Sequence, residues 1–117
     1  MAQKYKFFSD KEVKGLDPYL CALLDRAREL AGFPFIITSG LRTPAQNKKA
    51  GGASASLHLK GAAVDISCKD DCARFKMVKA AMEAGFKRIE VAPRHVHLDL
   101  GDSEMHPSNI LWIGTDG

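Results

Sequence analysis

Cysteine is scarce in this chain, and its count is odd. The three cysteines are Cys21, Cys68 and Cys72, and an odd number argues against a framework of disulfide bonds. Each is easily accommodated as a small apolar residue of a core. Cys68 and Cys72 do not indicate a metal site, because no second Cys or His pair with suitable spacing follows them.

Long hydrophobic runs are missing as well. Residues 1–8 hold no apolar stretch of the length that secretory signal peptides contain, and nothing elsewhere approaches the length of a membrane span. We therefore expect a protein that is cytoplasmic as synthesised and has no membrane partner. Its export would need a separate route.

The chain also has only a small excess of positive over negative charge. The formal net charge of +3 suits an anionic polymer such as a cell wall, although most proteins with this balance bind no polyanion. Aromatic residues make up only 8% of the chain and are not interleaved with basic runs, so we expect no nucleic-acid partner. With 117 residues, 45% of them hydrophobic, the chain is long enough for one domain, residues 1–117, with its own core.

What the sequence does contain is a ten-residue stretch, Ser56–Asp65, of the pattern S-x-H-x-x-G-x-A-x-D. A straight strand would hold His58 and Asp65 about 23 Å apart. The chain must bend for them to meet, and Lys60-Gly61 is the turn-forming pair between them. Residues 62–67 then alternate as in a half-buried strand. An imidazole and a carboxylate that meet in a cleft are two of the three protein ligands that a catalytic zinc usually has.

A third ligand is offered by residues 94–100, which alternate strictly between polar and apolar. His95, His97 and Asp99 share one face of this predicted strand, and the apolar residues share the other. The residues alone leave simpler roles open. A histidine on a strand is often only hydrogen-bonded, and Asp65 by itself fits a turn or cap carboxylate.

The rest of the chain predicts two main helices. Asp17-Pro18 is typical of a helix start and Gly32 of a helix end. A second helix is expected from Asp70-Asp71 to Gly85. Its apolar face is expected to hold Phe75, Val78 and Met82, and its exposed face Arg74, Lys76, Lys79 and Glu83.

Strands are expected at residues 35–38, 62–67, 86–91 and 94–100, with a helical turn over residues 44–50. Their short connections favour an α+β domain, in which an antiparallel sheet carries helices on one side. The single tryptophan, Trp112, is expected to pack over the sheet, and a place in a substrate cleft stays open.

These motifs resemble the zinc-dependent D-Ala-D-Ala carboxypeptidase family and its relatives. The resemblance covers the ten-residue motif, the H-x-H-x-D pattern of residues 95–99, and residues 39–43, which look like the family's S-G-x-R-[ST] segment. The matching blocks run from about residue 36 to residue 99. The family includes phage endolysins that cleave L-alanyl-D-glutamate bonds, and it shares a fold with the Hedgehog signalling domain.

The resemblance implies one Zn²⁺ bound by His58, Asp65 and His97, with Arg42 as a contact to a substrate carboxylate or to the oxyanion. It implies a metallopeptidase that hydrolyses the stem peptide of peptidoglycan, as a carboxypeptidase or an endopeptidase. We expect the protein to be a monomer that acts on the cell wall if released. Two non-enzymatic alternatives remain. One is a zinc-binding module of the Hedgehog type, and the other is a phage structural protein used for wall attachment.

At the position where many members of this family carry their proton-transfer residue, this chain has a different one. Many relatives carry an acidic residue three positions before the last histidine ligand, where this chain has Arg94, and arginine is no base at neutral pH. His95 is our favoured catalytic side chain, because strand alternation already places it on the face of His97. Glu90 is the alternative, provided that Ala92-Pro93 folds the chain back toward the metal.

Overall fold

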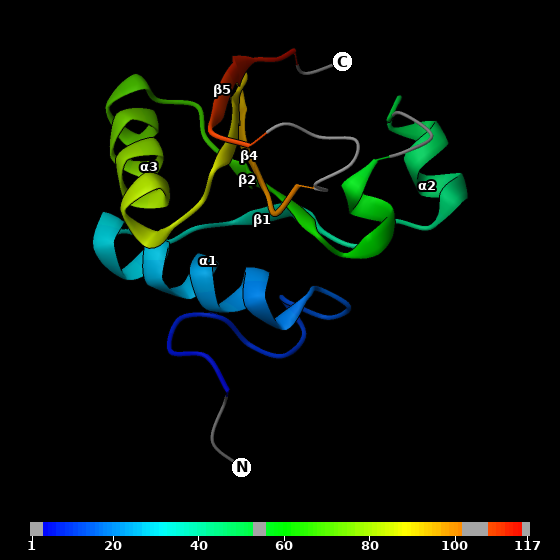
Figure 1. Ribbon diagram of the computed structural model, residues 1–117, viewed down its shortest axis with the longest axis horizontal. Helices are drawn as coiled ribbons and strands as arrows, with labels where there is room; N and C mark the ends of the chain where they lie inside the picture. The colour runs from blue at the N-terminus through cyan, green and yellow to red at the C-terminus, as the bar shows by residue number, and fades with distance from the viewer. Residues whose placement is uncertain (1–3, 53–55, 102–107, 116–117) are drawn as a thin grey trace.

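The computed structural model describes residues 4–52, 56–101 and 108–115. A five-stranded sheet lies at its centre, in the order β1-β2-β4-β3-β5 (Figure 1). The strands are β1 Ile37–Ser39, β2 Ala63–Ser67, β3 Arg88–Val91, β4 His95–Asp99 and β5 Ile110–Ile113. The helices are α1 Pro18–Ala31, α2 Pro44–Lys49, the 3₁₀ helix η1 Leu57–Lys60, and α3 Asp71–Ala84.

Helix α1 begins and ends at the residues expected. The Asp17 carboxylate accepts a hydrogen bond from the backbone N–H of Tyr19, Pro18 occupies the first turn, and Gly32 closes the helix in the left-handed conformation at φ 80°. The buried face of α1 carries Leu20, Leu24 and Ala27. It packs against the core and against α3.

Helix α3 has the expected ends, but of the three residues expected on its buried face only Val78 packs against the core, partly buried, and the expectation for Phe75 and Met82 was wrong. Its buried residues are Met77, Ala80 and Ala81, whereas Phe75 is 70% exposed and Met82 51% exposed. Alanines give a weak hydrophobic signal in a sequence, yet their small side chains let α3 approach α1 closely. Tertiary packing therefore overrides the stripe of larger apolar residues.

The sheet is antiparallel except at one edge. Strands β1, β2, β4 and β3 pair antiparallel, as expected, while β5 pairs parallel to β3. Strand β5 was not expected from the sequence, because its four residues Ile-Leu-Trp-Ile do not alternate between polar and apolar. Strand β1 begins two residues later than expected, and the neighbouring Ile36 is 65% exposed rather than buried.

The two faces of the sheet have different tasks. Val64 and Ile66 of β2, and Val96 and Leu98 of β4, are fully buried in the core that α1 and α3 complete. The opposite face carries the alternate residues of the same strands, which are polar except for Ala63. Among the described helices, none is long and apolar enough to cross a membrane.

The bend before β2 is fixed by Gly61. This residue has φ 69°, and a Cβ placed on it would lie 2.2 Å from the backbone oxygen of Gly15. The backbone N–H of Asp17 donates to the Gly61 oxygen at 2.9 Å. Only glycine fits both the backbone conformation and the close approach, so the turn expected at Lys60-Gly61 is present and sets the path of η1 into β2.

Candidate metal centre

The polar face of the sheet carries one row of residues that crosses all five strands. In register, Ser39 of β1 pairs with Asp65 of β2, Asp65 with His97 of β4, His97 with Glu90 of β3, and Glu90 with Trp112 of β5. Paired residues in a sheet point to the same face. The strand order therefore brings together side chains that lie up to 73 positions apart in the sequence.

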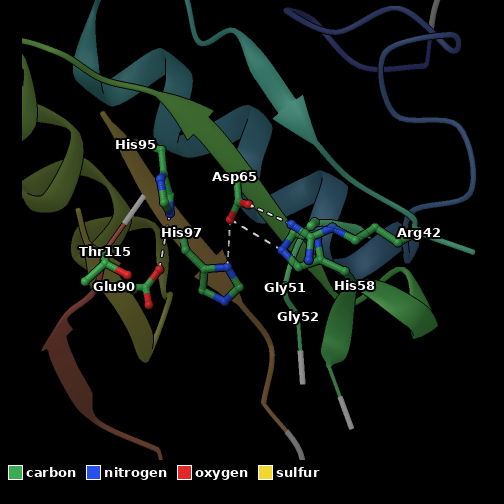
Figure 2. Close-up of a pocket in the computed structure, with 10 residues that line it drawn as sticks. Arg42, Gly51, Gly52, His58, Asp65, Glu90, His95, His97 and Thr115 are labelled. Atoms are coloured by element: carbon green, nitrogen blue, oxygen red, sulfur yellow. Dashed lines mark hydrogen bonds and ion pairs between the residues drawn. The ribbon is translucent and has the colours of Figure 1, made fainter. Parts of the chain in front are cut away.

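His58 reaches this row from η1, whose N-cap is Ser56. The Ser56 hydroxyl accepts a hydrogen bond from the backbone N–H of His58 at 3.3 Å. The His58 Nδ1 lies 2.8 Å from the backbone oxygen of Gly40, which can only accept, so Nδ1 carries the proton. The other ring nitrogen, Nε2, faces the Asp65 Oδ1 at 3.4 Å (Figure 2).

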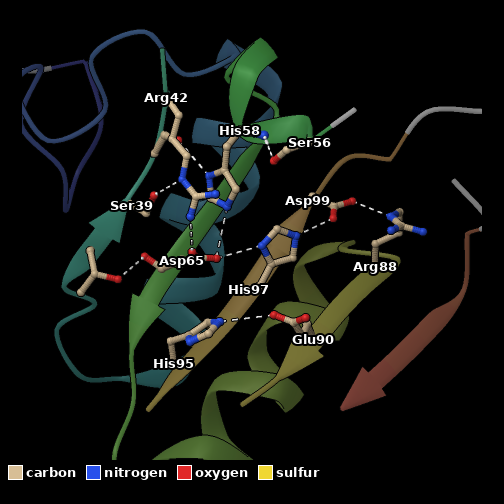
Figure 3. A network of polar contacts seen from close by, with 12 residues as sticks. Ser39, Arg42, Ser56, His58, Asp65, Arg88, Glu90, His95, His97 and Asp99 are labelled. Carbon is tan, nitrogen blue, oxygen red and sulfur yellow. Dashed lines mark hydrogen bonds and ion pairs between the residues drawn. The ribbon is translucent and has the colours of Figure 1, made fainter. Parts of the chain in front are cut away.

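His97 has a neighbour at each ring nitrogen. Its Nδ1 lies 2.8 Å from Asp65 Oδ1, and its Nε2 lies 2.6 Å from Asp99 Oδ2. The other oxygen of Asp99 accepts from the Nε of Arg88 at 2.6 Å, in a buried ion pair (Figure 3). A proton held at Nε2 by Asp99 leaves Nδ1 free to bind a metal, which is how carboxylates orient ligand histidines elsewhere.

The three expected ligands converge on one point. One donor atom from each of His58, Asp65 and His97 can be chosen so that all three lie within 4.8 Å of one another. Two imidazole nitrogens and a carboxylate oxygen are a donor set that zinc accepts, with a position left for water or substrate. The fixed ring orientations of both histidines fit a metal in this place.

Electrostatics of the metal-free site point the same way. Burial raises the pKa of Asp65, but hydrogen bonds with His58 and His97 outweigh it and hold that pKa far below its usual range. Burial lowers the pKa of His97, yet the hydrogen bonds with Asp65 and Asp99 raise it to about 9. A divalent cation would take the place of that proton between the two ligands.

Arg42 lies at the mouth of the site, but its guanidinium is directed at its neighbours. Nε donates to Ser39 Oγ at 2.9 Å, one terminal nitrogen to Asn47 Oδ1 at 3.2 Å, and the other to Asp65 Oδ2 at 3.3 Å. Gly52 permits this arrangement, since a Cβ there would lie 2.1 Å from Asn47 Oδ1. Arg42 thus orients the carboxylate ligand, and its direct contact with substrate stays a prediction.

The two alternative proton-transfer residues are neighbours. His95 Nε2 lies 3.3 Å from Glu90 Oε1, and the second oxygen of Glu90 accepts from the indole N–H of Trp112 at 2.9 Å. Glu90 and His95 line the same cleft of about 550 Å³ as Arg42 and the three candidate ligands (Figure 2). The tight connection at Ala92-Pro93 supplies the reversal that Glu90 required, with the Ala92 N–H bonded to the His95 oxygen.

Sequence reasoning missed several residues that support the site. Asn47 and Arg88 are buried polar side chains, and nothing in their local sequence distinguishes them from surface residues. The place of Trp112 depends on the parallel pairing of β5, which the sequence does not display. Asp99, which was expected on the same strand face as His97, lies behind its ring, with Oδ2 2.6 Å from Nε2.

A cleft with two histidines, an aspartate and an adjacent glutamate–imidazole pair is typical of a metallopeptidase. The peptidase M15 family matches this chain over residues 4–99, and the chain belongs to that family. Among solved structures, the L-Ala D-Glu endopeptidase ChiX of Serratia marcescens is similar with a TM-score of 0.64 and 21% identity, over 81% of this chain and 87% of that one. A search of curated proteins found no match. The structural likeness confirms the expected α+β peptidase fold.

Proposed function

We propose that this chain is a zinc-dependent peptidase that hydrolyses peptide bonds in the stem peptides of peptidoglycan. The convergence of His58, Asp65 and His97 within the cleft carries the proposal. Membership of the peptidase M15 family supports the peptidase chemistry. The name of the structural neighbour, an L-Ala D-Glu endopeptidase, supports the choice of substrate.

Zinc bound by these three residues would act as a Lewis acid, polarising the substrate carbonyl and lowering the pKa of the attacking water. The protein's own groups do the rest. Asp99 and the Gly40 oxygen hold the two imidazoles in their ligating tautomers. Arg42 holds Asp65 and adds a positive charge at the cleft, where negative charge develops on the carbonyl oxygen.

Proton transfer falls to the Glu90–His95 pair. The attacking water forms a bond to the carbonyl carbon and gives one proton to this pair, which shares it between Glu90 Oε1 and His95 Nε2. The pair then returns the proton to the leaving amine nitrogen as the C–N bond breaks. His95 remains the favoured carrier and Glu90 its partner. Turnover of zinc-loaded His95→Ala and Glu90→Gln tests this assignment, and it fails if both variants keep wild-type turnover.

Between the two modes of cleavage, the geometry favours an endopeptidase. A carboxypeptidase must bind the terminal carboxylate of its substrate, usually through a cation. Arg42 is the only lysine or arginine among the described residues that line the cleft, and three of its five N–H donors already bond to neighbours, one of them to the candidate metal ligand Asp65. A substrate that continues beyond the scissile bond needs no such cation.

The test is digestion of purified peptidoglycan followed by mass spectrometry of the muropeptides. We expect new amino groups to appear with wild-type protein, to vanish with a chelator and to return with added zinc. Fragments cut within the stem indicate an endopeptidase, and loss of terminal D-alanine alone indicates a carboxypeptidase. Absence of hydrolysis at full zinc loading would overturn the proposal in favour of a non-catalytic zinc module or a phage wall-attachment protein.

A further inference from the structure

Strand β5 places Trp112 beside the proton-transfer pair. Trp112 and Glu90 are register partners in the parallel β3–β5 ladder. The indole N–H donates to Glu90 Oε2 at 2.9 Å, while Glu90 Oε1 lies 3.3 Å from His95 Nε2. Both oxygens of one partly buried carboxylate therefore have a partner, the indole N–H at Oε2 and the His95 ring at Oε1.

Gly114 shows that this corner of the site is closely fitted to Glu90. A Cβ added to Gly114 would lie 2.3 Å from both Cδ and Oε2 of Glu90. The backbone N–H of Gly114 also donates to the Val91 oxygen at 2.9 Å, which holds the end of β5 against β3. Gly114 has no positive φ, so its backbone conformation does not require glycine. Glycine is needed here because a side chain would occupy the space of the Glu90 carboxylate.

The Trp112 ring also contacts the side of the site that holds the metal ligands. It lies 5.8 Å from the His97 ring, centroid to centroid. The guanidinium of Arg88, which pairs with Asp99 behind His97, stacks 4.9 Å from the indole centre. One aromatic side chain therefore adjoins both the proton-transfer pair and the group that fixes the ligand histidine.

We infer that Trp112 is a positioning residue of the hydrolytic reaction, which holds the Glu90 carboxylate toward His95 through its indole N–H. The inference rests on the proposed peptidase function. Strand β5 is then part of the site rather than a mere extension of the sheet. Trp112 acts through Glu90 and makes no contact with the reacting bond.

The test compares zinc-loaded variants on soluble muropeptides. Trp112→Phe keeps an aromatic ring and removes the N–H, and we expect kcat to fall at least tenfold with KM changed less than twofold. Gly114→Ala keeps the indole but pushes the carboxylate away, and we expect the same loss of kcat. Ile113→Thr, at a neighbouring position that is 87% exposed, serves as the matched control and should retain wild-type kinetics.

Two further results separate positioning from a structural effect. In a Glu90→Gln background, Trp112→Phe should lower kcat less than twofold further, because its effect passes through Glu90. Because the chain has one tryptophan, a single indole N–H signal is expected in a ¹⁵N NMR spectrum. We expect it to be slow to exchange with solvent and to shift on Glu90→Gln.

The outcomes are distinguishable. Wild-type kcat in Trp112→Phe, multiplicative losses in the double variant, or an indole signal that Glu90→Gln leaves unchanged would each overturn the inference while the peptidase function stands. Wild-type protein that binds zinc but hydrolyses no muropeptide would overturn the proposed function. The role of Trp112 in the reaction would then fall with it, whatever the NMR signal shows.

Discussion

His97 lies between two carboxylates, with Asp65 at Nδ1 and Asp99 at Nε2. This arrangement distinguishes it from His95, which shares its strand face but contacts Glu90 instead. Among the residues that the structure describes, only His97 shares a point of convergence with His58 and Asp65. The geometry thus favours His97 as the third ligand and leaves His95 for proton transfer.

Metal analysis of two alanine variants checks this division. We expect His97→Ala to lose its zinc, because one of three protein ligands is gone. His95→Ala is the matched control on the same strand face and should keep one zinc per chain. Zinc retained in His97→Ala but lost from His95→Ala would show that the ligand is wrongly assigned.

Arg42 combines a charge at the cleft with a hydrogen bond to a ligand. Arg42→Ala should lower turnover at saturating zinc by roughly 10²–10³-fold, the loss of about 2.7–4 kcal/mol typical of an oxyanion contact. Because its side chain is not part of the apolar core, the melting temperature of the zinc-loaded variant should stay near that of the wild type. A large fall in melting temperature with unchanged activity per folded molecule would contradict this role.

At the scale of elements, α3 shows where sequence patterns mislead. The larger apolar residues predicted that one face of α3 would be buried. The face that packs against α1 is a different one, which includes Met77. We expect Met77→Ala, at 1% exposure, to lower the free energy of unfolding by about 2–5 kcal/mol through the cavity it leaves. Phe75→Ala, on the exposed side, should change it by less than about 0.5 kcal/mol. Chemical denaturation measures both, and equal losses would contradict the assignment of the buried face.

The elements that the sequence predicted well are those with local signals. Capping residues such as Asp17 and Gly32 set the ends of α1, and strict alternation set β2 and β4. The ligand triad followed from a motif that a family resemblance made specific. The remaining elements depend on long-range pairing. Strand β5 has no alternation of its own, and its place beside Glu90 exists only because it pairs parallel to β3.

At the scale of the whole molecule, the site links stability to pH. In the metal-free protein His97 has a pKa of about 9, above its unfolded value of about 6.5. Its stabilising contribution is therefore fully present below about pH 6.5 and is lost as the pH rises through about 9. The pKa values of Asp65 and Asp99 are lowered in the folded protein. The stability that they contribute is lost only as the pH falls below the pKa values of the unfolded chain, so it is constant between pH 6.5 and pH 9.

We therefore expect the melting temperature of metal-free protein to fall between pH 6.5 and pH 9, with a loss on the order of 2 kcal/mol in the free energy of unfolding. Zinc-loaded protein is the control. It should not show this fall, because the metal replaces the proton on His97. Calorimetry of both forms measures the effect. A metal-free melting temperature that stays level or rises across this window would contradict the electrostatic description of the site.

We propose that one metal, held by His58, Asp65 and His97, makes this chain a peptidase. The most direct test of this role is to titrate zinc into metal-free protein. The release of amino groups from peptidoglycan stem peptides is measured at each addition. We expect no hydrolysis without zinc, a linear rise, and saturation at one zinc per chain. Hydrolysis by the metal-free protein, or none after one full equivalent is bound, would contradict the claim.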